Sequence, residues 1–218
     1  MLALGAGGWN TGGGIADDGT RVSRTDSWNG YVRSPGDSRW TTLIRPGDNI
    51  SASMIDTTYI NPSPWSETGT YEVAICATNS SVIYVCSMGY VYKTADKSVT
   101  TTRTALAQQV NLAPNAGSRQ TGPGMAIDPI NPNVCWLMTL TGARRTIDGG
   151  ASWTNISTAS LPAPTLARAF IAFDRSPAVS SDARRACMPS STALGFIAAS
   201  MPARPGRWSR AGRSAQGT

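Results

Sequence analysis

The sequence contains no histidine, few charged residues (15% of 218) and only four cysteines. Without histidine, a serine or cysteine nucleophile lacks its usual general base, so hydrolytic chemistry would depend on carboxylate, tyrosine or lysine side chains. The cysteines form no Cys-x-x-Cys pair, which argues against structural zinc, and we expect neither metal nor cofactor. Cys76, Cys86 and Cys135 lie in apolar runs. They are expected to be buried, unbridged strand residues, with a disulfide as the alternative.

Long apolar runs are also missing, since none approaches the roughly 18 residues of a membrane-spanning helix. The first ten residues have neither the basic region nor the apolar length of a signal peptide, so the sequence shows no targeting signal, and the location of the protein is left open. What the sequence has instead is 22 glycines and 14 prolines, with abundant serine and threonine. This composition indicates an all-β chain rich in turns.

The net charge of +6 belongs to one end of the chain. Residues 1–174 contain 12 basic and 12 acidic side chains, whereas residues 175–218 contain seven arginines and a single acid, Asp182. A basic arm of this kind is one way to bind nucleic acid. The internal repeat described next suggests a different origin for these arginines.

An internal repeat organises residues 8–174, which we expect to form one domain. Its units contain several short strands separated by Asp-Pro, Asn-Pro, Asp-Gly and similar turn signals. A repeat of about 40–50 residues with several strands per unit is typical of a β-propeller blade, so we predict a partial propeller of about three blades. The expected strands are 21–25 and 30–34 in the first unit; 73–76, 82–86 and 90–93 in the second; and 125–127, 134–139, 142–145 and a strand from Ser152 in the third.

The segment Thr146–Trp153 reads TIDGGASW. It resembles the Asp-box, or BNR repeat, of sialidase-like and xyloglucanase-like propellers, Ser/Thr-x-Asp-x-Gly-x-Ser/Thr-Trp. In such a turn Asp148 accepts hydrogen bonds from nearby backbone N–H groups, and Gly150 adopts a positive φ. The hydroxyls of Thr146 and Ser152 tie the two strands together, and Trp153 packs between turns. The resemblance implies a structural role for Asp148 rather than that of a catalytic acid or metal ligand.

A second, eroded copy of this turn lies 52 positions earlier in the sequence. Thr94, Asp96 and Thr100 keep their places, whereas Ser98 replaces the glycine and Thr101 replaces the tryptophan. We expect the turn to survive. The missing tryptophan removes a packing anchor whose truncation to alanine in a core costs about 3–5 kcal/mol.

The basic tail, residues 175–218, interrupts the repeat. Residues 170–174 predict the first strand of a further blade, and the period places another Asp-box near position 200, but residues 194–208 show neither turn nor strand. Read in a shifted frame, their codons permit Gly-Val-Tyr-Arg-Ser-x-Asp-Ala-Gly-Glu-Ala-Trp, a complete Asp-box. We therefore hypothesise a frameshift between about residues 174 and 182, which makes the tail disordered rather than a nucleic-acid arm.

Residues 23–32, SRTDSWNGYV, resemble the first-blade motif Arg-Thr-Asp-x-x-Gly-Ala-Tyr of family 74 glycoside hydrolases, the xyloglucanases. The resemblance implies that Asp26 is a general base. An inverting glycosidase needs a second carboxylate about 6.5–9.5 Å away. In that family it comes from a second propeller, which this chain lacks. Asp26 is therefore expected to be inactive alone, and the alternative is a turn-capping aspartate. The other positions in register are Arg24, Thr25, Gly30 and Tyr31, with Asn29 displacing the family alanine.

The function predicted is thus a fragment of a glycan-active propeller with xyloglucanase-like ancestry. One alternative is a non-catalytic module that binds polysaccharide or protein through exposed aromatic side chains, for which the candidates are Trp9, Trp28, Trp40 and Trp65. Another is a non-functional remnant whose open blade edges promote self-association. Sialidase activity is disfavoured because no Arg-Ile-Pro motif lies near the N-terminus. We expect no nucleic-acid or membrane partner.

Overall fold

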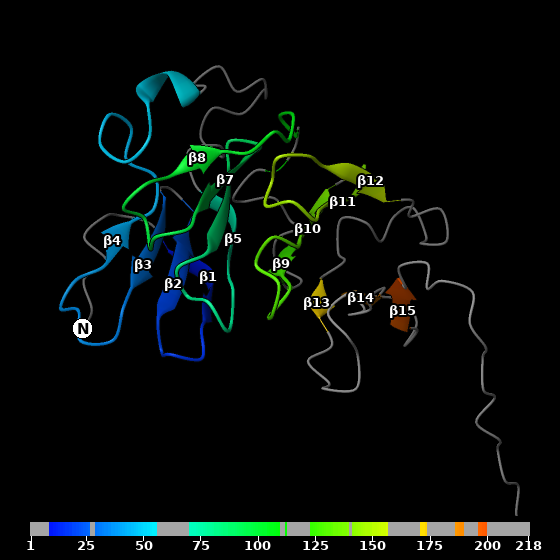
Figure 1. The fold of residues 1–218 in the computed structure, drawn as a ribbon, viewed down its shortest axis with the longest axis horizontal. Coiled ribbons are helices and arrows are strands. Elements are labelled where there is room, and N and C mark those ends of the chain that lie inside the picture. The colour runs from blue at the N-terminus through cyan, green and yellow to red at the C-terminus, as the bar shows by residue number, and fades with distance from the viewer. Residues whose placement is uncertain are drawn as a thin grey trace, which may run out of the picture.

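The protein is almost entirely β in the computed structural model, which describes residues 9–26, 29–55, 70–109, 112, 123–139, 141–156 and 171–173, and the backbone of 186–189 and 196–199. Three four-stranded antiparallel sheets and a three-stranded sheet follow one another along the chain. Within each sheet, the strands lie side by side in sequence order, as in propeller blades. Figure 1 shows the sheets arranged in succession from blue to orange.

The strands have the following bounds. The first blade contains β1 (Asn10–Ile15), β2 (Arg21–Thr25), β3 (Gly30–Arg33) and β4 (Thr41–Thr42). The second contains β5 (Thr70–Ile75), β6 (Ile83–Ser87), β7 (Tyr90–Thr94) and β8 (Thr102–Arg103). The third contains β9 (Met125–Ile127), β10 (Cys135–Thr139), β11 (Gly142–Thr146) and β12 (Thr154–Ile156). The last sheet contains β13 (Ala172–Phe173), β14 (Ala186–Pro189) and β15 (Phe196–Ala199). A 3-10 turn, η1 (Ala52–Met54), lies between β4 and β5.

The predicted all-β partial propeller is confirmed, and each predicted strand is present within a few residues of its expected bounds. Strand β1 was not predicted because its sequence, NTGGGI, has low β-propensity. Its glycines serve close packing instead. A Cβ on Gly12 would lie 2.5 Å from the Arg24 Nε atom, and one on Gly14 would lie 3.2 Å from the Ile75 side chain. The glycines of the first strand therefore allow its close approach to neighbouring residues.

The expectation that the tail contains no strand is wrong for two segments. Residues 186–189 form β14 and residues 196–199 form β15, and β14 pairs with β13 on one side and β15 on the other. Strands 186–189 and 196–199 are short, apolar stretches, which suit extension of the sheet begun by β13. The rest of the predicted disordered tail lies outside the described residues.

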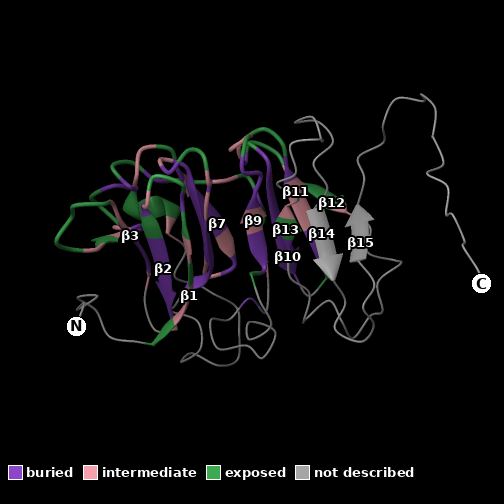
Figure 2. Ribbon diagram, turned by 90° about the horizontal axis from the view of Figure 1, so that it is seen from below, coloured by how far each residue is buried: buried purple, intermediate pink, exposed green. Residues whose placement is uncertain are grey.

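The hydrophobic core is divided into layers between successive sheets, which Figure 2 shows as buried strands. The layer between the first two blades is built around Val22, Leu43 and Ile83. The layer between the second and third blades is built around Tyr84 and Leu137. A third layer, with Trp136 and Ile171, lies beyond the third blade. Each blade thus depends on its neighbours for burial of its faces.

The cysteine prediction is confirmed for three residues. Cys76, Cys86 and Cys135 are buried and free. Burial raises the pKa of the Cys86 and Cys135 thiols well above the ordinary value, which keeps them protonated and unreactive. No helix among the described residues is long and apolar enough to cross a membrane.

Candidate functional site

The Asp148 turn, residues 146–153, connects β11 to β12 and is closed by side-chain hydrogen bonds. Asp148 Oδ1 accepts hydrogen bonds from the Thr146 hydroxyl (2.8 Å) and the Ser152 amide (2.9 Å), and Asp148 Oδ2 accepts one from the Ser152 hydroxyl (2.5 Å). The Thr146 hydroxyl in turn accepts a hydrogen bond from the Gly150 amide (2.8 Å). Gly149 and Gly150 have φ values of 76° and 94°, which glycine adopts without strain. Every oxygen of Asp148 is thus used within its own turn.

The Asp96 turn, residues 94–101, has the same construction between β7 and β8. Asp96 accepts hydrogen bonds from the Thr94 hydroxyl (2.8 Å) and from the amide (2.9 Å) and hydroxyl (2.6 Å) of Thr100. The Ser98 amide donates to the Thr94 hydroxyl at 2.8 Å, as Gly150 does to Thr146. Ser98 has a φ of 76° although it carries a side chain. The two substitutions therefore leave the hydrogen bonding of the turn intact.

Both turns dock onto the preceding blade. The Ala105 amide, just after β8, donates a hydrogen bond to the Gly150 carbonyl at 2.8 Å. A Cβ on Gly150 would lie 2.6 Å from a Thr104 methyl group, so the glycine also permits this close approach. Trp153 packs at the edge of the core layer between the second and third blades. The turn therefore joins one blade to the next.

In the Asp96 turn, polar contacts take the place of the missing glycine and tryptophan. The Ser98 hydroxyl donates to the Thr42 carbonyl (2.9 Å), and the Thr101 hydroxyl donates to the Leu43 carbonyl (3.0 Å). Asn49 Nδ2 donates to the Thr101 hydroxyl (2.9 Å) and lies within hydrogen-bonding distance of the Ser98 hydroxyl (3.0 Å). The sequence comparison alone suggested only a loss of packing, whereas the structure shows a buried hydrogen-bond network in its place.

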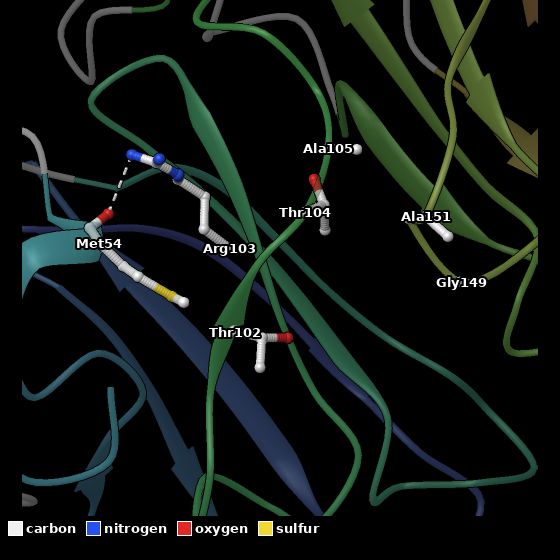
Figure 3. Close-up of a pocket in the computed structure, with 8 residues that line it drawn as sticks. Met54, Thr102, Arg103, Thr104, Ala105, Gly149 and Ala151 are labelled. Carbon is white, nitrogen blue, oxygen red and sulfur yellow. Dashed lines mark hydrogen bonds between the residues drawn. The ribbon is translucent and has the colours of Figure 1, made fainter. Parts of the chain in front are cut away.

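A pocket of about 450 Å³ lies beside the Asp148 turn, between β8 and η1 (Figure 3). It is lined by Met54, residues 102–105 and residues 149–151. The Arg103 guanidinium is already engaged, because it donates to the Met54 carbonyl at 3.2 Å and lies 4.7 Å from the centre of the Tyr90 ring. The lining contains no carboxylate and no other charged group. This pocket offers no acid–base pair for catalysis.

The hydrogen bonds from Ser152 and Thr146 lower the pKa of Asp148 to about 2. A carboxyl with a lowered pKa stabilises the fold above its unfolded value of about 3.9, and this contribution is lost as the pH falls through the folded value. We therefore expect Asp148→Asn to destabilise the protein at pH 5 but to lose that effect progressively between pH 4 and pH 2. Urea unfolding at these pH values measures the difference.

Ser152→Ala provides the matched variant, because it removes the first of the hydrogen bonds that lower the pKa of Asp148. It should move the pH at which the Asp148 contribution is lost upward, toward 4. An Asp148→Asn destabilisation that is equal at pH 5 and pH 2 would contradict the linkage.

Asp26 lies at the opposite end of β2 from these turns. Its amide and carboxylate both contact Trp9, because Asp26 Oδ1 accepts a hydrogen bond from the Trp9 amide at 2.8 Å and the Asp26 amide donates to the Trp9 carbonyl at 3.2 Å. The Trp9 side chain is 83% exposed. Asp26 is partly buried at the start of the β2–β3 loop, of which residues 27 and 28 lie outside the described part. The site thus ties the Asp26 carboxylate to the backbone of an exposed tryptophan.

Asn29, the position at which the motif departs from the xyloglucanase pattern, has a structural explanation. Asn29 Oδ1 accepts hydrogen bonds from the Gly30 amide (2.9 Å) and the Ile44 amide (3.1 Å), and its Nδ2 donates to the Ile44 carbonyl (2.5 Å). These bonds fasten the β2–β3 loop to the chain leaving β4. Asn29 therefore supports the loop that carries Asp26.

Arg24 and Glu72 form a buried ion pair that the sequence analysis did not foresee. Arg24 Nη1 lies 3.0 Å from Glu72 Oε1, and their side chains are 4% and 5% exposed. Glu72 Oε2 accepts a hydrogen bond from the Gly124 amide at 2.7 Å, and the Arg24 guanidinium donates to the Tyr71 carbonyl. This network joins β2 of the first blade, β5 of the second and the chain entering β9 of the third. The one available signal was a glutamate inside the apolar run TYEVAI.

The remaining sequence candidates are distributed as follows. Trp40 is partly buried beside the first blade, whereas Trp28 and Trp65 lie outside the described residues. Within the described part of the chain, no three histidine, cysteine, aspartate or glutamate residues cluster as metal ligands would. The geometry brings Asp26 and Trp9 together, and it separates Asp26 from the Asp96 and Asp148 turns.

The fold and its turns define the chain as a β-propeller. No protein-family model and no curated protein sequence matches it. Among solved structures, it is similar to the xyloglucanase of glycoside hydrolase family 74 from Xanthomonas campestris, with 22% identity and a TM-score of 0.65 over 88% of this chain and 29% of that chain. It is also similar to the family 74 enzyme of Niastella koreensis, with 22% identity and a TM-score of 0.62 over 90% of this chain and 30% of that chain. The likeness establishes the fold, and the chain spans less than a third of the length of either protein.

Proposed function

We propose that residues 8–174 are a blade unit of a glycan-active propeller of xyloglucanase-like ancestry, in which Asp26 is the general base and the Asp96 and Asp148 turns are Asp-boxes. The observation that carries the proposal is the position of Asp26. It follows Arg-Thr at the end of β2, and its carboxylate accepts a hydrogen bond from the backbone amide of Trp9, an exposed residue. The likeness to a family 74 xyloglucanase and to a second family 74 enzyme supports the same proposal.

In this proposal the described residues supply only half of the chemistry. In an inverting hydrolysis, one carboxylate takes a proton from the attacking water while a carboxylic acid protonates the leaving oxygen. We assign Asp26 to the first role. Glu72 is not available for the second because its carboxylate is buried and bonded to Arg24 and Gly124. We propose that the acid comes from outside the described residues, and this chain is expected to bind glycan without cleaving it.

Binding and hydrolysis of a xyloglucan oligosaccharide test the proposal. Titration calorimetry is expected to detect binding, and a reducing-end assay is expected to detect no turnover. Trp9→Ala should weaken binding about tenfold, since loss of one well-packed aromatic contact costs about 1–2 kcal/mol. Asp37→Ala, in the exposed β3–β4 turn, is the matched control and should bind as the parent does. A folded protein that binds neither xyloglucan nor another neutral β-glucan would overturn the proposal.

The alternative is a non-catalytic binding module, and the exposed Trp9 side chain favours it equally. The two functions differ in what Asp26 does. In a remnant of the enzyme, supplying the missing acid domain from a related xyloglucanase should restore some hydrolysis, and Asp26→Ala should abolish it. In a pure module, no added domain restores hydrolysis.

The frameshift hypothesis belongs to the same proposal and is tested on the encoding DNA. We expect the shifted frame beyond codon 174 to continue as further Asp-box blades. A shifted frame that soon meets stop codons, or that loses the repeat, would contradict it. The seven arginines of residues 175–218 would then need a function, and nucleic-acid binding would return as the first candidate.

A further inference from the structure

The flank of the first blade that faces away from the second blade differs in chemistry from the same flank in the other blades. The registers Ile15–Arg21, Ile75–Ile83 and Ile127–Cys135 align the three blades position by position. Arg21 therefore occupies the place of Ile83 and Cys135. Both of those residues are completely buried in the core layers between blades. A blade packed on this flank would have to bury the Arg21 charge.

One step along the same face, Ser23 repeats the pattern. It occupies the place of Val85 in the second blade and of Leu137 in the third, which are also buried core residues. Gly13, opposite Ser23, takes the place of Val73, which is opposite Val85. The flank has thus exchanged three apolar side chains for an arginine, a hydroxyl and a glycine. It is suited to a polar occupant.

A groove of about 370 Å³ runs along this flank. The glycines of β1 leave its floor without side chains, Arg21 and Ser23 line it from β2, and Trp40 borders it ahead of β4. Asn10, Gly13 and Arg21 are exposed, so the groove is open to solvent.

Two polar groups beside the groove lack partners. Ser23 is only 2% exposed, and its hydroxyl has no hydrogen-bond partner among the described residues. The Trp40 indole N–H is likewise buried without a partner there. Buried polar groups of this kind normally have a partner.

The charge on the flank is positive, and among the described residues Arg21 forms no ion pair. Arg21 lies directly opposite Arg33 in the β2–β3 register. Like charges in this position destabilise a sheet. The Arg33 Nε atom donates to the Asp37 carbonyl at 2.7 Å, which fixes the side chain in place, and the groove lining contains no acid. A carboxylate held by Arg21, with Arg33 beside it, would offset the repulsion with charge-assisted hydrogen bonds.

We propose that this groove binds an acidic polysaccharide through a uronic acid residue. Its carboxylate pairs with the Arg21 guanidinium beside Arg33, a sugar hydroxyl bonds the Ser23 hydroxyl, and the pyranose ring lies against Trp40. The site is separate from Asp26, because Arg21 is the first residue of β2 and Asp26 follows its last. At about 3.3 Å per strand residue, these ends lie roughly 16 Å apart. The proposal does not depend on Asp26 acting as a base.

Calorimetric titration with trigalacturonic acid, and with its fully methyl-esterified form as the neutral match, tests the proposal. The acid is expected to bind and the ester to bind at least tenfold more weakly, since a charge-assisted hydrogen bond contributes about tenfold or more. Arg21→Ile and Ser23→Val, which install the residues of the second blade, should each weaken binding of the acid about tenfold. Arg39→Ala, an exposed arginine outside the lining, should leave it unchanged.

Folding of each variant is checked by circular dichroism, so that loss of binding is not loss of structure. Equal binding of acid and ester, no binding by the folded parent, or unchanged binding by Arg21→Ile would each overturn the proposal.

The competing occupant of the groove is a second copy of the chain, which would associate through the open blade edges. Sedimentation velocity tests this alternative. A dimer of the unliganded parent that Arg21→Ile or Ser23→Val dissociates, and that Arg39→Ala leaves intact, would also overturn the proposal. Asp26→Ala should leave trigalacturonate binding intact, which separates this site from the proposed xyloglucan site.

Discussion

Replacing Glu72 with alanine is expected to lower the free energy of unfolding by about 3–5 kcal/mol, the typical cost of removing one partner of a buried ion pair. The variant leaves the Arg24 guanidinium buried and uncompensated, and it removes the acceptor of the Gly124 amide. Because the network joins three blades, the loss should lower the stability of the whole unit. Urea unfolding of Glu72→Ala measures the change.

Two further variants make the Glu72 result interpretable. Asp48→Ala breaks the exposed ion pair between Arg45 and Asp48 and should cost no more than about 1 kcal/mol. The double variant Arg24→Met/Glu72→Leu removes both buried charges and should recover much of the loss. A Glu72→Ala cost as small as that of Asp48→Ala would show that the buried pair does not join the blades.

The second large effect is expected at Tyr84, the completely buried side chain in the layer between the second and third blades. Tyr84→Ala should cost about 3–5 kcal/mol, as truncation of a buried aromatic residue does. Tyr84→Phe keeps the ring and removes only the hydrogen bond from the Tyr84 hydroxyl to the Pro132 carbonyl, 3.2 Å long, so it should cost about 1 kcal/mol.

Circular dichroism and tryptophan fluorescence together report this result. Circular dichroism follows all sheets, whereas fluorescence includes Trp136 and Trp153 of the third blade. Coincident transitions for Tyr84→Ala would show that the blades unfold together. If Tyr84→Ala were no less stable than Tyr84→Phe, the core layer between these blades would not hold them together.

The features that could be predicted from the sequence are those set by residues close together in the chain. Strands 125–127 and 134–139 are apolar runs bounded by Asp-Pro and Asn-Pro turns, and each lies where expected. The Asp148 turn was equally readable, because Thr146, Asp148, Gly150 and Ser152 bond to one another within seven residues. Such bonds need no information from the rest of the fold.

The Arg24–Glu72 pair could not be predicted, because its residues are 48 positions apart and meet only when two blades pack. The same holds for Ser98. The sequence indicated that the turn survives the replacement of glycine by Ser98, but not that carbonyls of the preceding blade would accept hydrogen bonds from its hydroxyl. Strands β14 and β15 were missed because β14 pairs with the edge that β13 presents, and β15 pairs in turn with β14.

By itself, the sequence determined the β class, the blade repeat, the aspartate turns and the place of Asp26 after a strand, since periodic apolar patterns and short-range hydrogen bonds are local. The tertiary structure alone decided which faces are buried. It turned Ile83 inward against a neighbouring blade and left Arg21, at the same register position, on an open flank. Burial depends on what packs against a strand, and that neighbour is distant in the chain.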